Sequence, residues 1–469
     1  MSAAMETNPV SAFGDWLAAT PAAWSAEARD AARAAFVDTI AVSVPGAVHP
    51  VTAKVYDAVR DWGAGPSTVI GTGARMAAPW AALVNGTAAH ALDFDDNFDP
   101  AKAHASAVLV PAILALAEQE GSPGAACIDA YIAGLQILGR AGQGVNPYHR
   151  NRGWHATATM GAIGAAAACA RLLGLDAAQA AHALSIATSM AGGFMSQFGT
   201  DTKPVHAGLA AKAGIVASGL ARSGLAAGLG TFDGPTGLNR LMVGPDYETL
   251  RDNLVTIDHG QTMRFETATV GEPLLILSSG LKAKRFPNCG SCHRAMDGLQ
   301  ALIGERGFGA ADVAAIDVRA PLSHLNNLMY TDPRDAAQAK FSLEYALAVL
   351  LLSGNCTLAD FEDEAWMRPE VRALYPLVHR HPVDLPEGAF PTEVEVTLTD
   401  GRRFATAVSM PAGSIAAPFT EAQLWGKFDG CVSGVLAADA RNALRGALES
   451  LPDLATAAPL MAPLKGPFA

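Results

Sequence analysis

Apolar residues recur every three or four positions from the N-terminus of the chain to about Gly271, a spacing that places them on one face of successive helices. Breaks between these segments fall at Gly, Pro or Asp, which begin or end helices. Ala and Gly dominate the apolar faces, so the helices can pack closely. The clearest helical segments are SAEARDAARAAFVDTIAVSV, PWAALVNGTAAHALDF, AVLVPAILALAEQEG and DAAQAAHALSIATSMAGG. This pattern predicts a domain built from many helices.

The pattern changes after Gly271. The segment VAAIDVRAP alternates like a half-buried strand, and EVEVTLT and RRFATAVSMP flank Asp400-Gly401, a pair that favours a tight hairpin turn. Between these strands AAQAKFSLEYALAVLLLSG is expected to form one helix, and helical spacing returns from Thr420 to Leu451. We therefore predict a mainly α protein with a large all-helical domain (1–271), a smaller α+β domain (272–412) and C-terminal helices (413–469) that rejoin the helical domain.

The composition is that of a folded, acidic protein. Of the 469 residues, 50% are hydrophobic and 17% are charged, which suits a large apolar core and not a disordered chain. The formal net charge of −12 disfavours binding to nucleic acid or to an anionic membrane. A protein this acidic must concentrate its Lys, Arg and His locally in order to bind an anionic substrate.

No segment predicts export or a membrane span. The N-terminal residues lack the basic segment and apolar run of a secretory signal. The longest uncharged stretch, Gly153–Ala170, consists largely of Ala, Gly and Thr, so we expect a buried helix packed through small side chains. A cytoplasmic location is expected, in which the six cysteines stay reduced.

An acidic loop is the first candidate for chemistry. After His90 the chain carries oxygen ligands at alternate positions, namely Asp93, Asp95, Asn97 and Asp99. A calcium loop would need Gly where Phe98 stands and a closing Glu where His104 stands, so we expect no calcium site. A solvated helix end is the simplest alternative. Carboxylates between apolar helices and bracketed by two histidines instead indicate an acid/base cluster.

A lysine before a proline is the second candidate. Lys203 is expected to be extended because the residue before a proline avoids the helical region, and Pro204 suits the first position of a helix. A lysine beside free helical N–H groups can bind a carboxylate, and if desolvated it can act as a base. An ordinary cap with a solvated lysine is the alternative. His155, which follows a Gly-Trp pair, is by itself typical of a core histidine.

A similar arrangement occurs at Lys284 and Arg285, which precede a proline and a helix start expected at Ser291. Cys289 and Cys292, followed by a histidine, have the spacing of haem-attachment and thioredoxin-like redox motifs. Haem attachment requires export, a redox motif requires a βαβ context, and zinc requires a second ligand pair, none of which the sequence predicts. The turn VIGTGARM also lacks the third small residue of a dinucleotide-binding loop.

Five blocks of sequence together resemble the MmgE/PrpD family: HALDFDDNF with HASAVLVPAILALAE, GWHATATMGAIGAAAA, FGTDTKPVHAGLAAKAG, KRFPNCGSCHRAMD and AKFSLEYALAVLLLSG. They occur in the family's order and cover nearly the whole chain. The family includes 2-methylcitrate dehydratase, cis-aconitate decarboxylase and iminodisuccinate epimerase. The resemblance implies a large helical domain built from both chain ends, a smaller α+β lid domain, a homodimer, and a cofactor-independent enzyme acting on a small polycarboxylate.

The resemblance also implies the site residues. The catalytic ones would be Asp93, His104, His155 and Lys203, and the substrate-binding ones would be Asn97, Lys284, Cys289 and Tyr330. No metal and no cofactor is implied. The decarboxylase type has Thr in place of Asn97 and His in place of Cys289, which favours dehydration for this chain.

All three implied reactions can begin with bond breaking at the carbon next to a carboxylate, so the site must stabilise negative charge on carboxylate oxygens. Lys203, Lys284 and a helix N-terminus are the expected sources of positive charge, and His155 or Lys203 is expected to take the proton. In a dehydratase, His104 oriented by Asp93 would protonate the leaving hydroxyl. An epimerase would return a proton to the opposite face. Two further interpretations are a non-catalytic carboxylate-binding protein and a Cys-X-X-Cys redox or haem protein.

Overall fold

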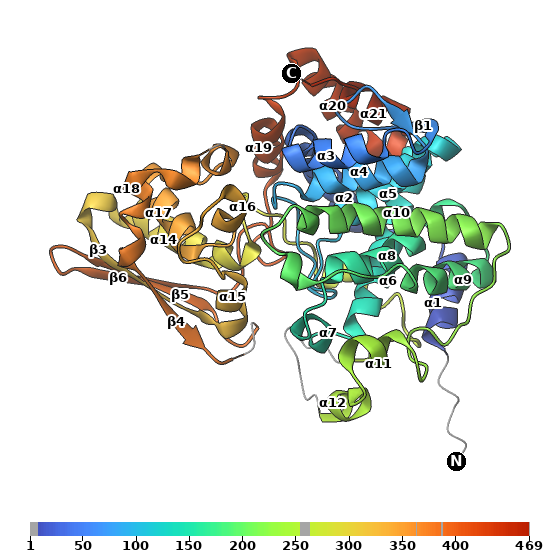
Figure 1. The fold of residues 1–469 in the computed structure, drawn as a ribbon, viewed down its shortest axis with the longest axis horizontal. Helices are drawn as coiled ribbons and strands as arrows, with labels where there is room; N and C mark the ends of the chain where they lie inside the picture. The colour runs from blue at the N-terminus through green and yellow to red at the C-terminus, as the bar shows by residue number, and fades with distance from the viewer. Residues whose placement is uncertain (1–7, 254–262, 363, 386–387, 469) are drawn as a thin grey trace.

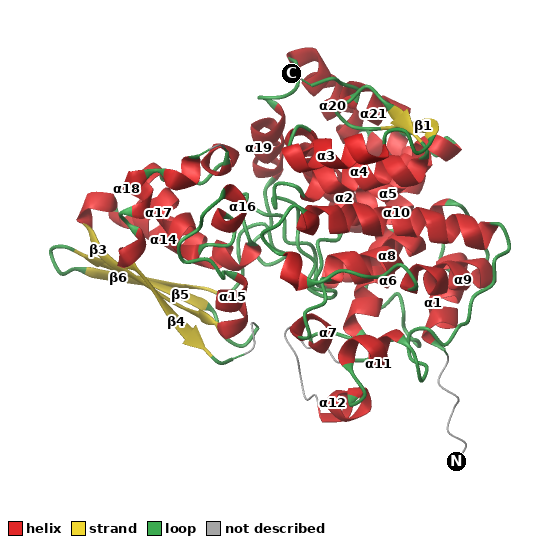
Figure 2. Ribbon diagram, in the orientation of Figure 1, coloured by secondary structure: helices red, strands yellow, loops and turns green. Residues whose placement is uncertain are grey.

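The computed structural model describes residues 8–253, 263–362, 364–385 and 388–468. The protein is mainly α-helical: helices crowd one end of the molecule and a four-stranded sheet lies at the other (Figures 1 and 2). Separate hydrophobic cores underlie the two ends. We call the residues of the larger core the helical part, and those of the smaller core, from Phe286 to Phe404, the α+β part.

The helical part contains most of the helices. In chain order they are α1 (Pro9–Ala19), α2 (Ala26–Ala47), α3 (Pro50–Val59), α4 (Ala78–His90), α5 (Ser106–Glu120), α6 (Gly124–Gln143), α7 (Tyr148–Asn151), α8 (Ala156–Leu172), α9 (Ala177–Thr188), α10 (Thr202–Arg222), α11 (Leu238–Val243), α12 (Tyr247–Asn253) and α13 (Leu275–Ser278). A short ribbon of β1 (Ala64–Thr68) and β2 (Arg75–Met76) precedes α4. The helices expected from periodicity are α2, α4, α5 and α9. Local signals start two of them: Ser25 caps α2, and Asp176 forms a capping box with Gln179 at α9.

Small residues let the central helices α4, α8 and α10 lie close together. Gly86 of α4 faces Gly208 of α10, and a Cβ added at Gly208 would stand 2.0 Å from the carbonyl oxygen of Leu83. The uncharged stretch forms α8, which is buried from Ala156 to Ala170 as expected. The C-terminal end of α4 and the N-terminal ends of α8 and α10 then meet where the helical part borders the α+β part.

The α+β part is built on a sheet with the strand order β4-β3-β5-β6, formed by β3 (Val313–Pro321), β4 (Val378–Val383), β5 (Thr392–Leu398) and β6 (Arg403–Val408). β3 pairs with β4 in parallel and with β5 antiparallel. The strand predicted at VAAIDVRAP is β3. The predicted hairpin joins β5 to β6, and Gly401 in its turn has a φ of +87°. Parallel β4 was not predicted.

The helices of the α+β part are α14 (His293–Arg306), α15 (Leu322–Asn327), α16 (Ala336–Ala339), α17 (Leu343–Ser353) and α18 (Pro369–Arg372). The single helix predicted at AAQAKFSLEYALAVLLLSG is wrong, because the chain breaks between α16 and α17. Ser342 caps α17 by accepting a hydrogen bond from the N–H of Tyr345. The break also turns Lys340 towards the helical part, where its Nζ donates to the backbone oxygen of Ala91.

The C-terminal segment packs in the helical part. It forms α19 (Glu421–Val432), α20 (Ala438–Glu449) and α21 (Ala458–Met461), and α19 packs beside α2 (Figure 1). Trp425 and Leu448 are buried in the larger core. Leu275 and Ile276 of α13 also belong to that core, so the helical part extends a few residues past the expected boundary at 271.

Within the described residues, no single helix is long and apolar enough to cross a membrane. The helices α2 and α3 are long and apolar enough for a membrane span only when they are taken together, and the chain bends by 82° between them.

Candidate active site

A cavity of about 140 Å³ lies where the helical part meets the α+β part. The loop after α4, the starts of α8 and α10, and the segment before α14 all reach it. Most of the predicted site residues line this cavity, namely Asp93, Asn97, His104, His155, Lys203, Lys284 and Cys289. Tyr330 is not among the lining residues and lies against Gly199, where an added Cβ would be 2.8 Å from its hydroxyl oxygen.

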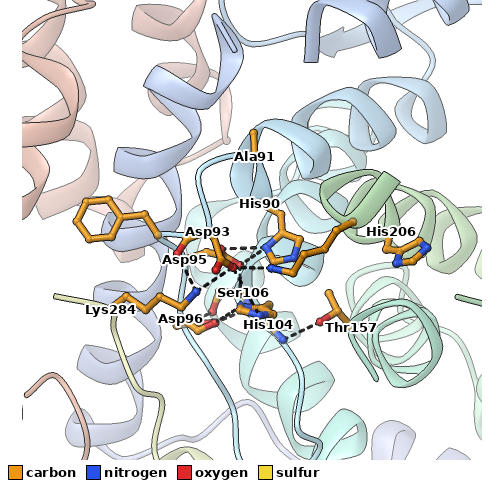
Figure 3. Close-up of polar contacts among 12 residues, drawn as sticks. His90, Ala91, Asp93, Asp95, Asp96, His104, Ser106, Thr157, His206 and Lys284 are labelled. Carbon is orange, nitrogen blue, oxygen red and sulfur yellow. Dashed lines mark hydrogen bonds and ion pairs between the residues drawn. The ribbon is translucent and has the colours of Figure 1, made fainter. Parts of the chain in front are cut away.

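Asp93 is the centre of the charged network (Figure 3). It follows the end of α4 with a φ of +53°, a left-handed conformation that Asp tolerates better than most residues. Its Oδ1 lies 2.6 Å from Lys203 Nζ and 3.0 Å from Lys284 Nζ, and Lys284 also donates to its backbone oxygen. Burial raises the pKa of Asp93, but the two ammonium groups outweigh burial and hold that pKa well below its usual range. One lysine from α10 and one from the segment before α14 therefore fix this carboxylate.

Lys203 lies within the first turn of α10, which corrects the extended cap predicted for it. The helix begins at Thr202, so Pro204 is its third residue and not its first. A proline is tolerated there because the N–H groups in the first turn of a helix have no acceptor within the helix. The N–H that proline lacks therefore costs no helical hydrogen bond. The Lys203 ammonium also lies 5.5 Å from the ring centroid of Phe198 and 5.1 Å from that of Phe341. These cation–π contacts stabilise the buried ammonium group.

His90 and His104 share one carboxylate. Their Nδ1 atoms lie 2.9 and 3.2 Å from Asp95 Oδ2 (Figure 3). His104 Nδ1 is also 2.9 Å from the backbone oxygen of Asp96, so this nitrogen carries a proton. Burial lowers the pKa of both histidines, that of His90 to about 3. The expectation that Asp93 orients His104 is corrected: Asp93 Oδ1 is 4.0 Å from Nε2, while Asp95 and the Asp96 carbonyl hold Nδ1.

His155 is the residue before α8 and is 3% exposed. Its Nδ1 lies 2.9 Å from Nδ1 of His206 on α10, so one of these two nitrogens donates a proton to the other. Burial, and then the charge of Lys203, hold the pKa of His155 well below its usual range, so the ring is neutral at pH 7. A neutral imidazole fixed by a hydrogen bond on one side and facing the cavity on the other is suited to proton transfer.

The atoms around Asp93 also have the spacing of a metal site, because His90, Asp93, Asp95 and His104 offer ligand atoms within 4.8 Å of one another. Two features argue against a cation there. The ammonium groups of Lys203 and Lys284 both contact Asp93 and would repel a divalent ion. The Nδ1 atoms of both histidines already contact Asp95. The donor set therefore fits proton transfer better than metal binding.

The cavity is strongly cationic in a chain whose net charge is −12. Six of the described lining residues are Lys or Arg, namely Lys102, Arg150, Lys203, Lys282, Lys284 and Arg294. Only two described lining residues, Asp93 and Asp99, are acidic. The sequence motifs identified two of the cations and missed the other four. Lys282 had a local signal, since it lies two residues before Lys284, whereas Arg150 and Arg294 reach the cavity only through the tertiary fold.

Arg150 joins the two parts across the cavity. Its Nη2 donates to Asn327 Oδ1 at 2.6 Å, and Asn327 Nδ2 donates to Ser291 Oγ at 2.9 Å. Asn97 connects the loop after α4 to the segment that leads into the α+β part, since it exchanges backbone hydrogen bonds of 3.0 and 2.8 Å with Lys282. The cavity walls from the helical part and the α+β part are thus held in register by hydrogen bonds.

Cys289 lines the cavity as a thiol. Burial raises the pKa of Cys289, so its sulfur is neutral at pH 7. Its backbone N–H donates to the backbone oxygen of Lys340 at 2.9 Å. All six cysteines are free, so Cys289 and Cys292 form no disulfide in this structure.

Comparison with known proteins gives the class to which this fold and site belong. The MmgE/PrpD N-terminal domain matches residues 11–250, and the MmgE/PrpD C-terminal domain matches residues 286–452. The second match starts at Phe286, where the smaller hydrophobic core begins. The chain belongs to the MmgE/PrpD family.

Its relatives include several cis-aconitate decarboxylases. The chain is 30% identical to the human cis-aconitate decarboxylase over 411 residues, which cover 84% of this chain and 80% of the human protein. It is 28% identical to the Aspergillus terreus cis-aconitate decarboxylase over 355 residues, which cover 71% and 70% of the two chains. A cis-aconitate decarboxylase-like protein of Aspergillus oryzae is 25% identical over 98% of both chains.

Proposed function

We propose that this protein is a cofactor-independent lyase that acts on a small di- or tricarboxylate at a carbon next to a carboxylate. The observation that carries the proposal is the concentration of six cationic side chains around one small cavity of an acidic protein. A cavity of about 140 Å³ limits the ligand to a small molecule, and its positive charge selects an anion with several carboxylates.

His155 is the base in this proposal. Its neutral ring can accept a proton, and the hydrogen bond to His206 fixes its orientation. Lys203 was the other candidate. Because its ammonium is paired with Asp93 at 2.6 Å, we assign it to charge stabilisation and not to proton abstraction. The negative charge that develops on the substrate carboxylate would then face Lys203 and Lys284, which are already in place before the reaction.

The finer proposal is dehydration, as in 2-methylcitrate dehydratase. His155 takes the proton from carbon, the electron pair forms the double bond, and the C–O bond breaks as His104 gives a proton to the leaving hydroxyl. Burial lowers the pKa of His104, and a bound polyanion favours its protonated form. Asp95, which lies beside Nδ1 of His104, stabilises the protonated ring before it gives up its proton.

Decarboxylation of cis-aconitate is the second candidate, and the names of the relatives favour it. In that reaction the bond to a carboxylate carbon breaks, CO₂ leaves, and the electron pair remaining on carbon takes a proton from an acid such as His104. Asn97 and Cys289, which line the cavity, are the positions at which this chain departs from the decarboxylase pattern. Epimerisation of an iminodisuccinate-like substrate is the remaining alternative.

Proton NMR of the purified protein in D₂O with 2-methylcitrate, citrate, cis-aconitate and iminodisuccinate separates these reactions. Alkene signals from the hydroxy acids would establish dehydration. Loss of CO₂ from cis-aconitate would establish decarboxylation, and deuterium uptake with a change of stereochemistry would establish epimerisation. Unchanged spectra for all four compounds would contradict the proposed substrate class.

A further inference from the structure

A second cavity, of about 460 Å³, adjoins the first. Asp93, Lys203 and Phe341 line both cavities and therefore form the partition between them. Beyond the partition the lining is mainly apolar and includes Val48, Leu92, Leu358, Phe361 and Val435. The proposed reaction uses none of these apolar residues, so this cavity needs a separate explanation.

Lys340 brings a positive charge to this apolar cavity. It follows α16 and is 7% exposed. Its Nζ donates to the backbone oxygen of Ala91 over a long distance of 3.4 Å and lies 6.0 Å from the ring centroid of Phe361. Lys203 and Lys284 are both paired with Asp93, whereas Lys340 has no carboxylate partner among the described residues.

The charge of Lys340 persists despite its burial. Burial lowers the pKa of Lys340 to about 8, so most of the molecules carry the ammonium at pH 7. A buried charge without a counter-ion is costly, and an anion in the adjoining space would offset that cost.

We propose that the second cavity binds a small monocarboxylate with an apolar body, whose carboxylate pairs with Lys340. The lining of the second cavity is mainly apolar and also contains Lys203 and the carboxylates of Asp93, Asp201 and Glu362. Asp93 is paired with Lys203, and Asp201 is paired with Lys54. Lys340, which has no carboxylate partner among the described residues, therefore matches one carboxylate on a hydrocarbon chain, whereas the six cations of the first cavity match a polycarboxylate. The apolar body lies against Phe361 and the neighbouring aliphatic side chains. This site is additional to the proposed catalytic one, and binding to it requires no turnover.

Isothermal titration of the full chain with hexanoate, in the presence of saturating tricarballylate, tests the proposal. Hexanoate is expected to bind at one site per chain while tricarballylate occupies the first cavity. Lys340→Met should weaken hexanoate binding by about tenfold or more, since it removes a charge-assisted contact. Lys212→Met is the matched control, because Lys212 lies on α10 and lines neither cavity.

Two further binding measurements, one with a cavity-filling variant and one with an uncharged ligand, complete the test. Ala337→Phe should also abolish hexanoate binding, because it fills the cavity without changing charge, and 1-hexanol should not bind. Unchanged melting temperatures would show that the variants are folded. Absence of hexanoate binding, equal affinity in Lys340→Met, or mutual exclusion with tricarballylate would overturn the proposal. Failure of tricarballylate alone to bind would count against the catalytic proposal, while hexanoate binding would still report on the second site.

Discussion

Asp93 places one carboxylate oxygen against two ammonium groups, one on α10 and one on the segment that leads into the α+β part. Asp93→Asn keeps the size of the side chain and tolerates the left-handed backbone, so it removes the charge alone. Two buried lysines would then lose their counter-charge. We expect kcat to fall by about 100-fold or more and the melting temperature to drop. Asp201→Asn, at an exposed carboxylate paired with Lys54, should change neither value, and an unaltered kcat in Asp93→Asn would contradict this role.

His206 is assigned as a positioning residue because it holds the ring of His155. His206→Ala should lower kcat by about tenfold to 100-fold, the cost of a lost buried hydrogen bond, with little change in KM. His206→Asn retains a hydrogen-bonding side chain and should restore part of the rate. Equal kcat in His206→Ala and the wild type would show that His155 needs no such partner.

At the residue scale, local signals identified most of the proposed site. Asp93, His155 and Lys203 lie next to helix ends, which Gly, Pro and acidic residues mark in the sequence, and all three reach the cavity. Arg150 and Arg294 carry no such mark, because their position depends on how distant elements pack. The partner of His104 was also unpredictable, since the choice between Asp93 and Asp95 depends on the backbone path of one loop.

At the scale of elements, the crossing of α4 and α10 positions the ends that carry His90 and Lys203. Gly208→Ala would place a Cβ 2.0 Å from the carbonyl oxygen of Leu83, so the helices must separate. We expect a loss of about 1–3 kcal/mol in the free energy of unfolding. Gly219→Ala, in the same helix with nothing within 4 Å of the added Cβ, should stabilise the protein by up to about 1 kcal/mol. Chemical denaturation measures both values, and equal effects would contradict the close packing.

Periodicity predicted elements well where one local pattern decides the structure. The hairpin at Gly401 and strand β3 follow from turn chemistry and alternation. The helix expected over α16 and α17 is interrupted where Lys340 and Phe341 line the second cavity and Ser342 caps α17. Strand β4, with the sequence VHRHPV, has weak alternation and depends on parallel pairing with β3.

At the scale of the whole molecule, buried histidines make stability depend on pH. Burial lowers the pKa of His90, His149 and His293 to about 3 in each case. In the unfolded chain these histidines bind protons below about pH 6.5, so the unfolded state holds more protons between about pH 3 and pH 6.5. Stability is therefore complete above this window and falls as the pH decreases through it.

When the pH is lowered from about 8 to about 5, each of these histidines should reduce the free energy of unfolding by about 2 kcal/mol. Urea denaturation at the two pH values measures the loss. His149→Gln removes one titrating group and should reduce the loss by about that amount. A free energy of unfolding that is the same at both pH values would contradict the burial of neutral histidines.

Six cationic side chains surround the cavity where the two parts of the molecule meet, and the central claim is that this cavity performs the chemistry. The most direct measurement compares the wild type, Lys203→Met and Lys212→Met by proton NMR with the polycarboxylate panel. The account predicts turnover of one polycarboxylate by the wild type and by Lys212→Met, and a loss of about 1000-fold or more in Lys203→Met. Turnover by Lys203→Met at the wild-type rate would contradict it.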